Sequence, residues 1–236
     1  MNEDIDCEII EDSLNENQTI AGVCKLTTED STTVEDEHTF ERKKLTGDVT
    51  CEFLEVAFHQ ILRSRQVYPW DIFVARKKYN IPVFMSCYPP LNLYIAGIMT
   101  SVKPLIDQGI VKRVVLLLLS SLTVLEQFVF ELSGELPQES SDEFFINVEH
   151  SFRAVLTNLV TYVRADNDTK LPTSFQVKVY VTSCPSSDLF STDGTGLLWV
   201  KCEKDENKSK LSSVKSIVNS SGFGIQLFIL ENIENS

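Results

Sequence analysis

The sequence predicts an α+β fold in which helices pack on one face of a mainly antiparallel sheet. Three observations lead to this prediction. Apolar residues recur at helical spacing in three segments, strand-length apolar segments lie between them, and a short connection joins two consecutive strands. With 236 residues, 43% of them apolar, the chain is long enough for one domain with a sizeable core and a tail.

The first helix is predicted over residues 45–68. Leu54 and Phe58 lie on its apolar stripe, and the polar residues on the opposite side include His59. We expect His59 to be solvated. Pro69 ends the helix.

Residues 72–79 are a short mixed segment that we expect to be an edge strand. It carries Arg76, Lys77 and Lys78, and lysine at a sheet edge discourages aggregation. A nucleic-acid contact is the alternative role of these three residues.

A second helix is predicted from Pro89 and Pro90, since proline is tolerated in a first helical turn. Its buried stripe runs from Leu91 to Ile106, and Tyr94 lies on the flank of that stripe.

Residues 111–120 are apolar on both faces and predict a central strand, which pairs as a hairpin with residues 124–132. A long amphipathic helix follows over 142–164, and residues 174–183 alternate as a strand.

The last part of the chain differs, because short apolar pieces (196–200, 214–218 and 223–230) are separated by polar stretches. This pattern is typical of an extended segment laid over a sheet. In the last piece, Gln226 and Phe228 share one face and the aliphatic residues share the other.

The acidity of the chain is concentrated at its N-terminus. Residues 1–40 contain twelve acidic residues and one lysine, so they carry −11 of the net charge of −13. We expect residues 1–44 to be an acidic disordered tail, because they cannot bury enough apolar surface to offset ordering entropy. A specific docking segment is the alternative role of this region. The near-neutral remainder lacks the basic stripe of duplex-binding proteins, so no direct nucleic-acid contact is expected.

The cysteine usage and the lack of a secretory signal or membrane span lead us to expect an intracellular protein. The six cysteines contain no CxxC pair and are expected to be reduced. The acidic N-terminus lacks the apolar region of a secretory signal, and the longest aliphatic run, 114–119, is too short to span a bilayer.

Catalytic and cofactor motifs are missing from the sequence. His38, His59 and His150 form no cluster with zinc spacing, and there is no nucleophile elbow, P-loop or G-x-G-x-x-G. The carboxylates of Asp142–Glu143 and of Asp166 and Asp168 do not form a general acid/base pair. We therefore expect no enzyme activity, no metal and no cofactor.

Several motifs carry a resemblance to a known family. They are CEFLEVAFHQIL (51–62), VYP…IF…RKKYN-PV (67–83), MSC-P-LN-YI (85–95), VKPL (102–105), QFVFE (127–131) and VEHSFRA (148–154). Over most of residues 45–181 the chain resembles the HORMA-domain accessory subunits of translesion DNA polymerase zeta. The resemblance implies a HORMA core over 45–183 with three helices, and a C-terminal safety belt over 184–236.

The resemblance also implies a mechanism. The belt wraps around an extended partner peptide, which becomes a strand between core and belt. Release is slow because the belt must open, and in this family an AAA+ ATPase opens it. The implied peptide partners are the catalytic subunit of polymerase zeta and, in some lineages, a DNA-end-protection subunit. The peptides contain proline, and aromatic residues at Tyr94 and Trp199 match those that hold them.

A second implied surface, built on the belt, binds the C-terminal domain of the translesion deoxycytidyl transferase. Leu211, Gln226 and Phe228 match it, although core packing of Phe228 is an open alternative. Arg153 matches an arginine central to dimerisation between HORMA domains and is expected on the outer helix face. Asn158 and Arg164 depart from the family pattern there, which leaves a homodimer or heterodimer undecided.

Three functions are compatible with the sequence. The first is a non-catalytic adaptor, acting in the nucleus or also in the cytoplasm, that joins polymerase zeta to the transferase scaffold in translesion synthesis. The second is a cell-cycle regulator that clamps components of the anaphase-promoting machinery with the same belt. The third, an unrelated enzyme, would need a convergent polar cluster.

Overall fold

The protein is described by a computed structural model at residues 5–9, 37–121, 123–133, 142–165, 171–182, 200–201 and 224–231. The helices in these ranges are α1 (Glu37–Ser64), α2 (Pro89–Asp107) and α3 (Asp142–Ala165), with a short 3-10 helix, η1 (Trp70–Ile72). The strands are β1 (Ile5–Ile9), β2 (Phe73–Lys78), β3 (Ile81–Ser86), β4 (Val111–Ser120), β5 (Thr123–Ser133), β6 (Ser174–Val181), β7 (Val200–Lys201) and β8 (Gly224–Glu231).

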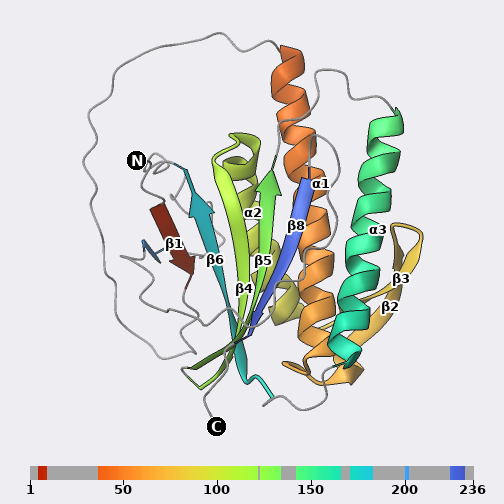
Figure 1. Cartoon of the computed structure of the whole chain (residues 1–236), viewed down its shortest axis with the longest axis vertical. Coiled ribbons are helices and arrows are strands. Elements are labelled where there is room, and N and C mark those ends of the chain that lie inside the picture. Colours follow the sequence, from red (N-terminus) through yellow and green to blue (C-terminus); the bar gives the residue numbers. More distant parts are fainter. Residues whose placement is uncertain are drawn as a thin grey trace.

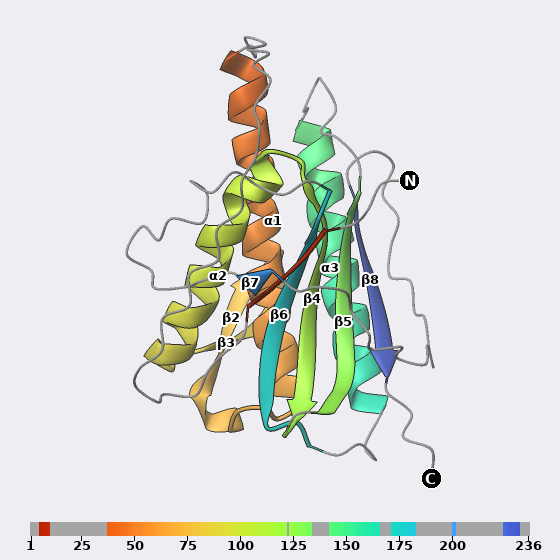
Figure 2. The same ribbon diagram turned by 90° about the vertical axis from the view of Figure 1, so that its left-hand side faces the viewer.

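The main sheet confirms the predicted fold class. Its strand order in the described ranges is β7-β1-β6-β4-β5-β8, and every neighbouring pair is antiparallel. The three α-helices gather on one side of it (Figures 1 and 2). β4 lies between β5 and β6, as its uninterrupted apolar sequence predicts for a central strand.

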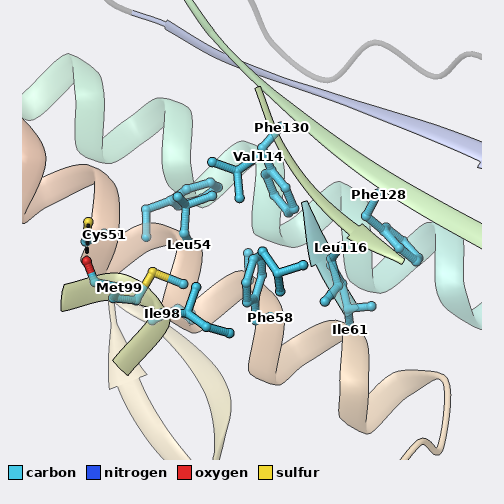
Figure 3. Packing of buried hydrophobic residues seen from close by; sticks show 14 of the residues in the cluster. Cys51, Leu54, Phe58, Ile61, Ile98, Met99, Val114, Leu116, Phe128 and Phe130 are labelled. Carbon is cyan, nitrogen blue, oxygen red and sulfur yellow. Dashed lines mark hydrogen bonds between the residues drawn. The ribbon is translucent and has the colours of Figure 1, made fainter. Parts of the chain in front are cut away.

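The hydrophobic core lies between the helices and the sheet. Phe58 and Leu54 of α1 are fully buried against β4 and β5 residues such as Leu116 and Phe130 (Figure 3). The rings of Phe53 in α1 and Phe152 in α3 stack with centroids 4.3 Å apart, which joins two helices over the sheet. Burying each such side chain stabilises the fold by roughly 1.5–3 kcal/mol.

The N-terminal region differs from the expected disordered tail of residues 1–44 in two places. Residues Ile5–Ile9 form β1, and α1 begins at Glu37 instead of residue 45. Composition alone predicts disorder for an acidic segment, but a free strand edge on β6 supplies pairing partners that composition does not reveal. The early start of α1 is explained by helix-forming residues such as Glu41, Arg42 and Lys43.

A second, two-stranded sheet confirms the edge strand predicted at residues 72–79 and adds one strand to it. The predicted edge strand is β2, but it pairs with β3, which was not predicted. Tyr79 and Asn80 join the two strands with φ angles of 48° and 58°, as a two-residue hairpin turn requires. This hairpin lies against α1, on the side away from the main sheet (Figure 1).

The hairpin explains why the prediction of a solvated His59 was wrong. His59 is only 1% exposed, and its Nδ1 accepts a hydrogen bond from the backbone N–H of Ser86, at 3.5 Å. The neighbouring Gln60 accepts one from the N–H of Phe84, at 3.1 Å. The polar side of α1 is therefore covered by β3, and burial lowers the pKa of His59 to about 4.

A bidentate ion pair fastens the C-terminal end of α1 to the sheet. The Nε and Nη2 atoms of Arg65 donate to the two carboxylate oxygens of Glu126 on β5, at 2.7 and 2.6 Å. Both side chains are 5% exposed. Because charges buried to this degree need their partners, the pair fixes where α1 ends relative to β5.

We predict that His59 makes stability depend on pH. Its folded-state pKa lies below the ordinary 6.5, so the unfolded chain takes up the proton first as pH falls. The free energy of unfolding should therefore be undiminished above about pH 6.5 and should fall by about 2 kcal/mol towards about pH 5. Urea unfolding of the wild type and of His59→Gln at both pH values measures this loss. Parallel pH profiles for the two proteins would contradict it.

We predict that replacing one partner of the Arg65–Glu126 pair destabilises the fold more than replacing both. Arg65→Met or Glu126→Leu alone should lower the free energy of unfolding by about 3–5 kcal/mol, because each leaves a buried charge without its counter-ion. The double variant should recover most of that loss. The matched control is the exposed pair of Lys78 and Glu52, where Lys78→Met should cost less than about 1 kcal/mol. Equal losses in both single variants and the double variant, measured in urea, would refute this role.

Candidate functional site

The described part of the chain contains no group of His, Cys, Asp and Glu residues that could hold a metal. Cys51 is buried, its thiol donates to the carbonyl of Met99 (Figure 3), and burial followed by the charge of Asp107 raises its pKa to about 12. Such a thiol is a poor nucleophile. His150 is exposed on α3, as predicted. No helix in the described ranges is long and apolar enough to cross a membrane.

The candidate site is the edge of β6 that faces away from β4. An extended segment pairs with this edge: it is β1, in register from Ile5 opposite Val181 to Ile9 opposite Val177. The other edge of β1 pairs with β7, where Cys7 is opposite Lys201. A strand therefore lies beside β6 (Figure 1), between it and a piece of the C-terminal region.

The C-terminal region reaches both ends of the sheet. β7 is the outermost strand beside β1, whereas β8 pairs with β5 at the opposite end. The predicted extended piece at 223–230 is confirmed as β8, and residues 214–218 lie outside the described residues. A strand paired with β6 is thus also paired with β7, while β8, from the same C-terminal region, is paired with β5 at the far end of the sheet.

The chemistry of the β6 edge suits an extended ligand. Val177, Val179 and Val181 are buried on the core face, and Lys178 and Tyr180 alternate with them. Main-chain hydrogen bonds at such an edge contribute about 1 kcal/mol each, and alternate side-chain positions provide selectivity.

Tyr94 lies on α2 beside this strand. Its half-buried ring meets the ring of Phe175, in β6, edge to face with centroids 5.5 Å apart. Phe175 precedes by two residues the stretch that pairs with β1. Trp199 directly precedes β7 and lies outside the described residues.

Gln226 and Phe228 lie on one face of β8, as predicted, since both are half-buried while Ile225, Leu227 and Ile229 are buried in the main core. Phe228 packs at the margin of a second apolar cluster on the other face of the sheet, formed by Val115, Leu117, Leu119 and Val129. The ring is therefore partly packed and partly accessible. Leu211 lies outside the described residues.

Arg153 makes contacts within the domain that its expected outer position did not suggest. Its Nε donates to the carbonyl of Tyr79 at 2.9 Å, and Nη2 pairs with Glu149 at 3.0 Å. It ties α3 to the β2–β3 turn, because the unpredicted hairpin brings that turn to the helix. Asn158 is exposed further along α3.

Sequence reasoning missed β1 and Phe175 as parts of this site. The signal for β1 was present, since Ile5, Cys7 and Ile9 alternate with Asp6 and Glu8. A five-residue alternation in an acidic segment is too short to distinguish a strand from chance.

Comparison with known proteins relates the chain to one group of sequences. It is 46% identical over 118 residues to the mitotic spindle assembly checkpoint protein MAD2B of Homo sapiens, which covers 49% of this chain and 56% of that protein. It is 33% identical over 200 residues to MAD2B of Danio rerio, which covers 82% of this chain and 94% of that protein. DNA polymerase zeta subunit 2 of Drosophila melanogaster is 26% identical over 171 residues, with coverage of 70% and 85%. No protein-family model matches the chain.

Solved structures share the fold at low sequence identity. A chain of the mitotic checkpoint complex superposes with a TM-score of 0.61 and 19% identity, covering 81% of this chain and 97% of that one. C. elegans HTP-2 bound to the HIM-3 closure motif gives a TM-score of 0.56 at 13% identity, covering 85% and 99%. These likenesses establish the HORMA fold expected from the sequence motifs.

The match to the Danio rerio protein extends over most of both chains, whereas the match to the human protein spans 56% of that protein's length. The fold and this alignment agree: the chain belongs to the MAD2B family of HORMA-domain proteins.

Proposed function

We propose that this protein is a non-catalytic adaptor subunit of DNA polymerase zeta that holds an extended peptide of the catalytic subunit at the edge of β6. Two relatives carry polymerase zeta in their names, as subunit 2 in Drosophila melanogaster and as processivity subunit in Arabidopsis thaliana. The observation that carries the proposal is the strand order, in which an extended segment lies between β6 and β7. The HTP-2 structures, which contain bound closure motifs, support the same reading.

The proposed mechanism is closure of residues 184–236 as a safety belt. The peptide adds as an antiparallel strand to β6, and the region containing β7 and β8 closes over it. Because β8 is hydrogen-bonded to β5 and its aliphatic side chains are buried in the core, opening the belt requires breaking many contacts at once. Peptide release is then slow, and an AAA+ remodelling ATPase accelerates it.

A second partner docks on the belt. The accessible part of Phe228, together with Gln226 on the same face and Leu211, contacts the C-terminal domain of the translesion deoxycytidyl transferase. The adaptor thereby connects the transferase scaffold to polymerase zeta in the nucleus. In this proposal Arg153 supports a HORMA homodimer or heterodimer indirectly, by holding the β2–β3 turn against α3.

A cell-cycle regulator is the second candidate function. The relatives from Homo sapiens and Danio rerio are named mitotic spindle assembly checkpoint proteins, and the checkpoint complex shares the fold. Mass spectrometry of natively co-purified proteins distinguishes the two. Recovery of a B-family DNA polymerase supports the adaptor, and recovery of an activator of the anaphase-promoting ubiquitin ligase supports the regulator.

We predict that Tyr94→Ala accelerates release of a proline-containing peptide from the polymerase zeta catalytic subunit. Loss of a rigid aromatic anchor in a binding site commonly costs 1–2 kcal/mol, so the dissociation rate should rise about tenfold. Surface-immobilised peptide and the full chain provide the measurement.

Two control variants separate peptide contact from folding. Tyr94→Phe keeps the ring against Phe175 and should release the peptide at nearly the wild-type rate. Leu93→Ala changes a neighbouring side chain that is 74% exposed, and it should leave the rate unchanged. An unaltered dissociation rate in Tyr94→Ala, with unfolding in urea also unaltered, would remove Tyr94 from the site.

A further inference from the structure

The position proposed for a partner peptide is occupied by the chain itself. Residues 5–9 pair with β6 on one side and with β7 on the other. We propose that this N-terminal strand is a built-in ligand, bound in cis, that a partner peptide must displace. The competition rests on the proposed function, whereas the docking of β1 on β6 does not.

The register of the pairing matches residue types along its length. Ile5, Cys7 and Ile9 stand opposite the buried valines 181, 179 and 177. Residues in register share a face of an antiparallel sheet. The three apolar residues of the segment therefore share a face with the core side of β6.

The acidic residues of the segment match the other face. Glu8 is in register with Lys178, and Asp6 with Tyr180, whose ring lies 4.7 Å from the guanidinium carbon of Arg113. Lys178 is only 8% exposed, and the register sets an acidic residue of the segment opposite it. Both faces of the segment thus favour one arrangement.

A slip of one residue would reverse this match. It would set Asp6 and Glu8 opposite the buried valines, at the cost of burying two carboxylates. The alternation of IDCEI therefore specifies one register on β6. A partner peptide would need the same kind of alternation to bind in a single register.

Pairing on both edges makes displacement necessary. β7 meets β1 at Cys7 and Glu8, while β6 meets it from Ile5 to Ile9. Two strands cannot pair with the same edge of β6. A competitor joined to the domain through residues 10–36 also acts at an effective concentration of about millimolar. Docking of β1 leaves only a fraction of the molecules with an unoccupied β6 edge. The apparent dissociation constant of a partner peptide equals its intrinsic value divided by that fraction.

Alkylation of Cys7 in the full chain tests the docking without any partner. The reference is Cys87, which is exposed and free. Each rate with iodoacetamide, divided by its rate in the urea-unfolded chain, gives a protection factor by mass spectrometry. We expect Cys7 to be protected at least about tenfold more than Cys87. The variant Ile5→Asp/Ile9→Asp should abolish this protection, and the matched control Ile5→Val/Ile9→Val should retain it.

Two outcomes of this labelling would overturn the docking. One is equal protection of Cys7 and Cys87 in the wild type. The other is protection of Cys7 that increases with protein concentration, because the strand would then come from a second copy.

Peptide binding tests the competition. The full chain and the Ile5→Asp/Ile9→Asp variant are compared for binding of the polymerase zeta catalytic-subunit peptide, and the variant should bind about tenfold more tightly. Equal affinity in both proteins would overturn the competition while leaving the adaptor function in place. No binding to either protein, with Cys7 still protected, would overturn the adaptor function and leave the cis-bound strand in place.

Discussion

An antiparallel sheet that does not close leaves two edges with unpaired backbone groups, and the arrangement of this molecule follows from how those edges are covered. β5 is covered by β8, and β6 is covered by β1 and then by β7. All three covering strands come from outside the segment between residues 37 and 181 that forms the helices and the central hairpin. Strand edges of this kind can accept or exchange a partner strand, because main-chain hydrogen bonds require little of the incoming sequence.

The centre of the sheet provides the rigid support that such exchange needs. β4 is buried on both faces, α1 and α3 meet through the stacked rings of Phe53 and Phe152, and the Arg65–Glu126 pair joins α1 to β5. The β2–β3 hairpin adds a third layer over α1, where it covers His59 and is held to α3 by Arg153. Strand addition at β6 therefore takes place against a surface that is stabilised from the opposite side.

The three candidate surfaces lie on different parts of this framework. Tyr94 stands beside β6 through its contact with Phe175, Gln226 and Phe228 lie on β8 at the other end of the sheet, and Arg153 lies on the helix layer. A strand bound at one edge and a protein bound near the other can be held together without competing for the same residues. This separation suits an adaptor. A strand of the chain's own at β6 would raise the affinity that a partner peptide needs in order to bind there.

Elements with long, regular apolar patterns can be predicted from the sequence alone. The bounds of β4 and the start of α3 were predicted to the residue, and those of β5, β6 and β8 to within one or two residues. Burial on one or both faces of an element produces a local pattern of apolar residues, and that pattern is visible in the sequence. The β4–β5 hairpin follows from the short connection between those two strands, but every other strand pairing depends on the folded arrangement. β3 is short and interrupted by Pro82, so its presence, and with it the burial of His59, depends on pairing with β2 and packing on α1. The strand at residues 5–9 depends on an edge formed near the other end of the chain, and no local pattern can report a contact of that range.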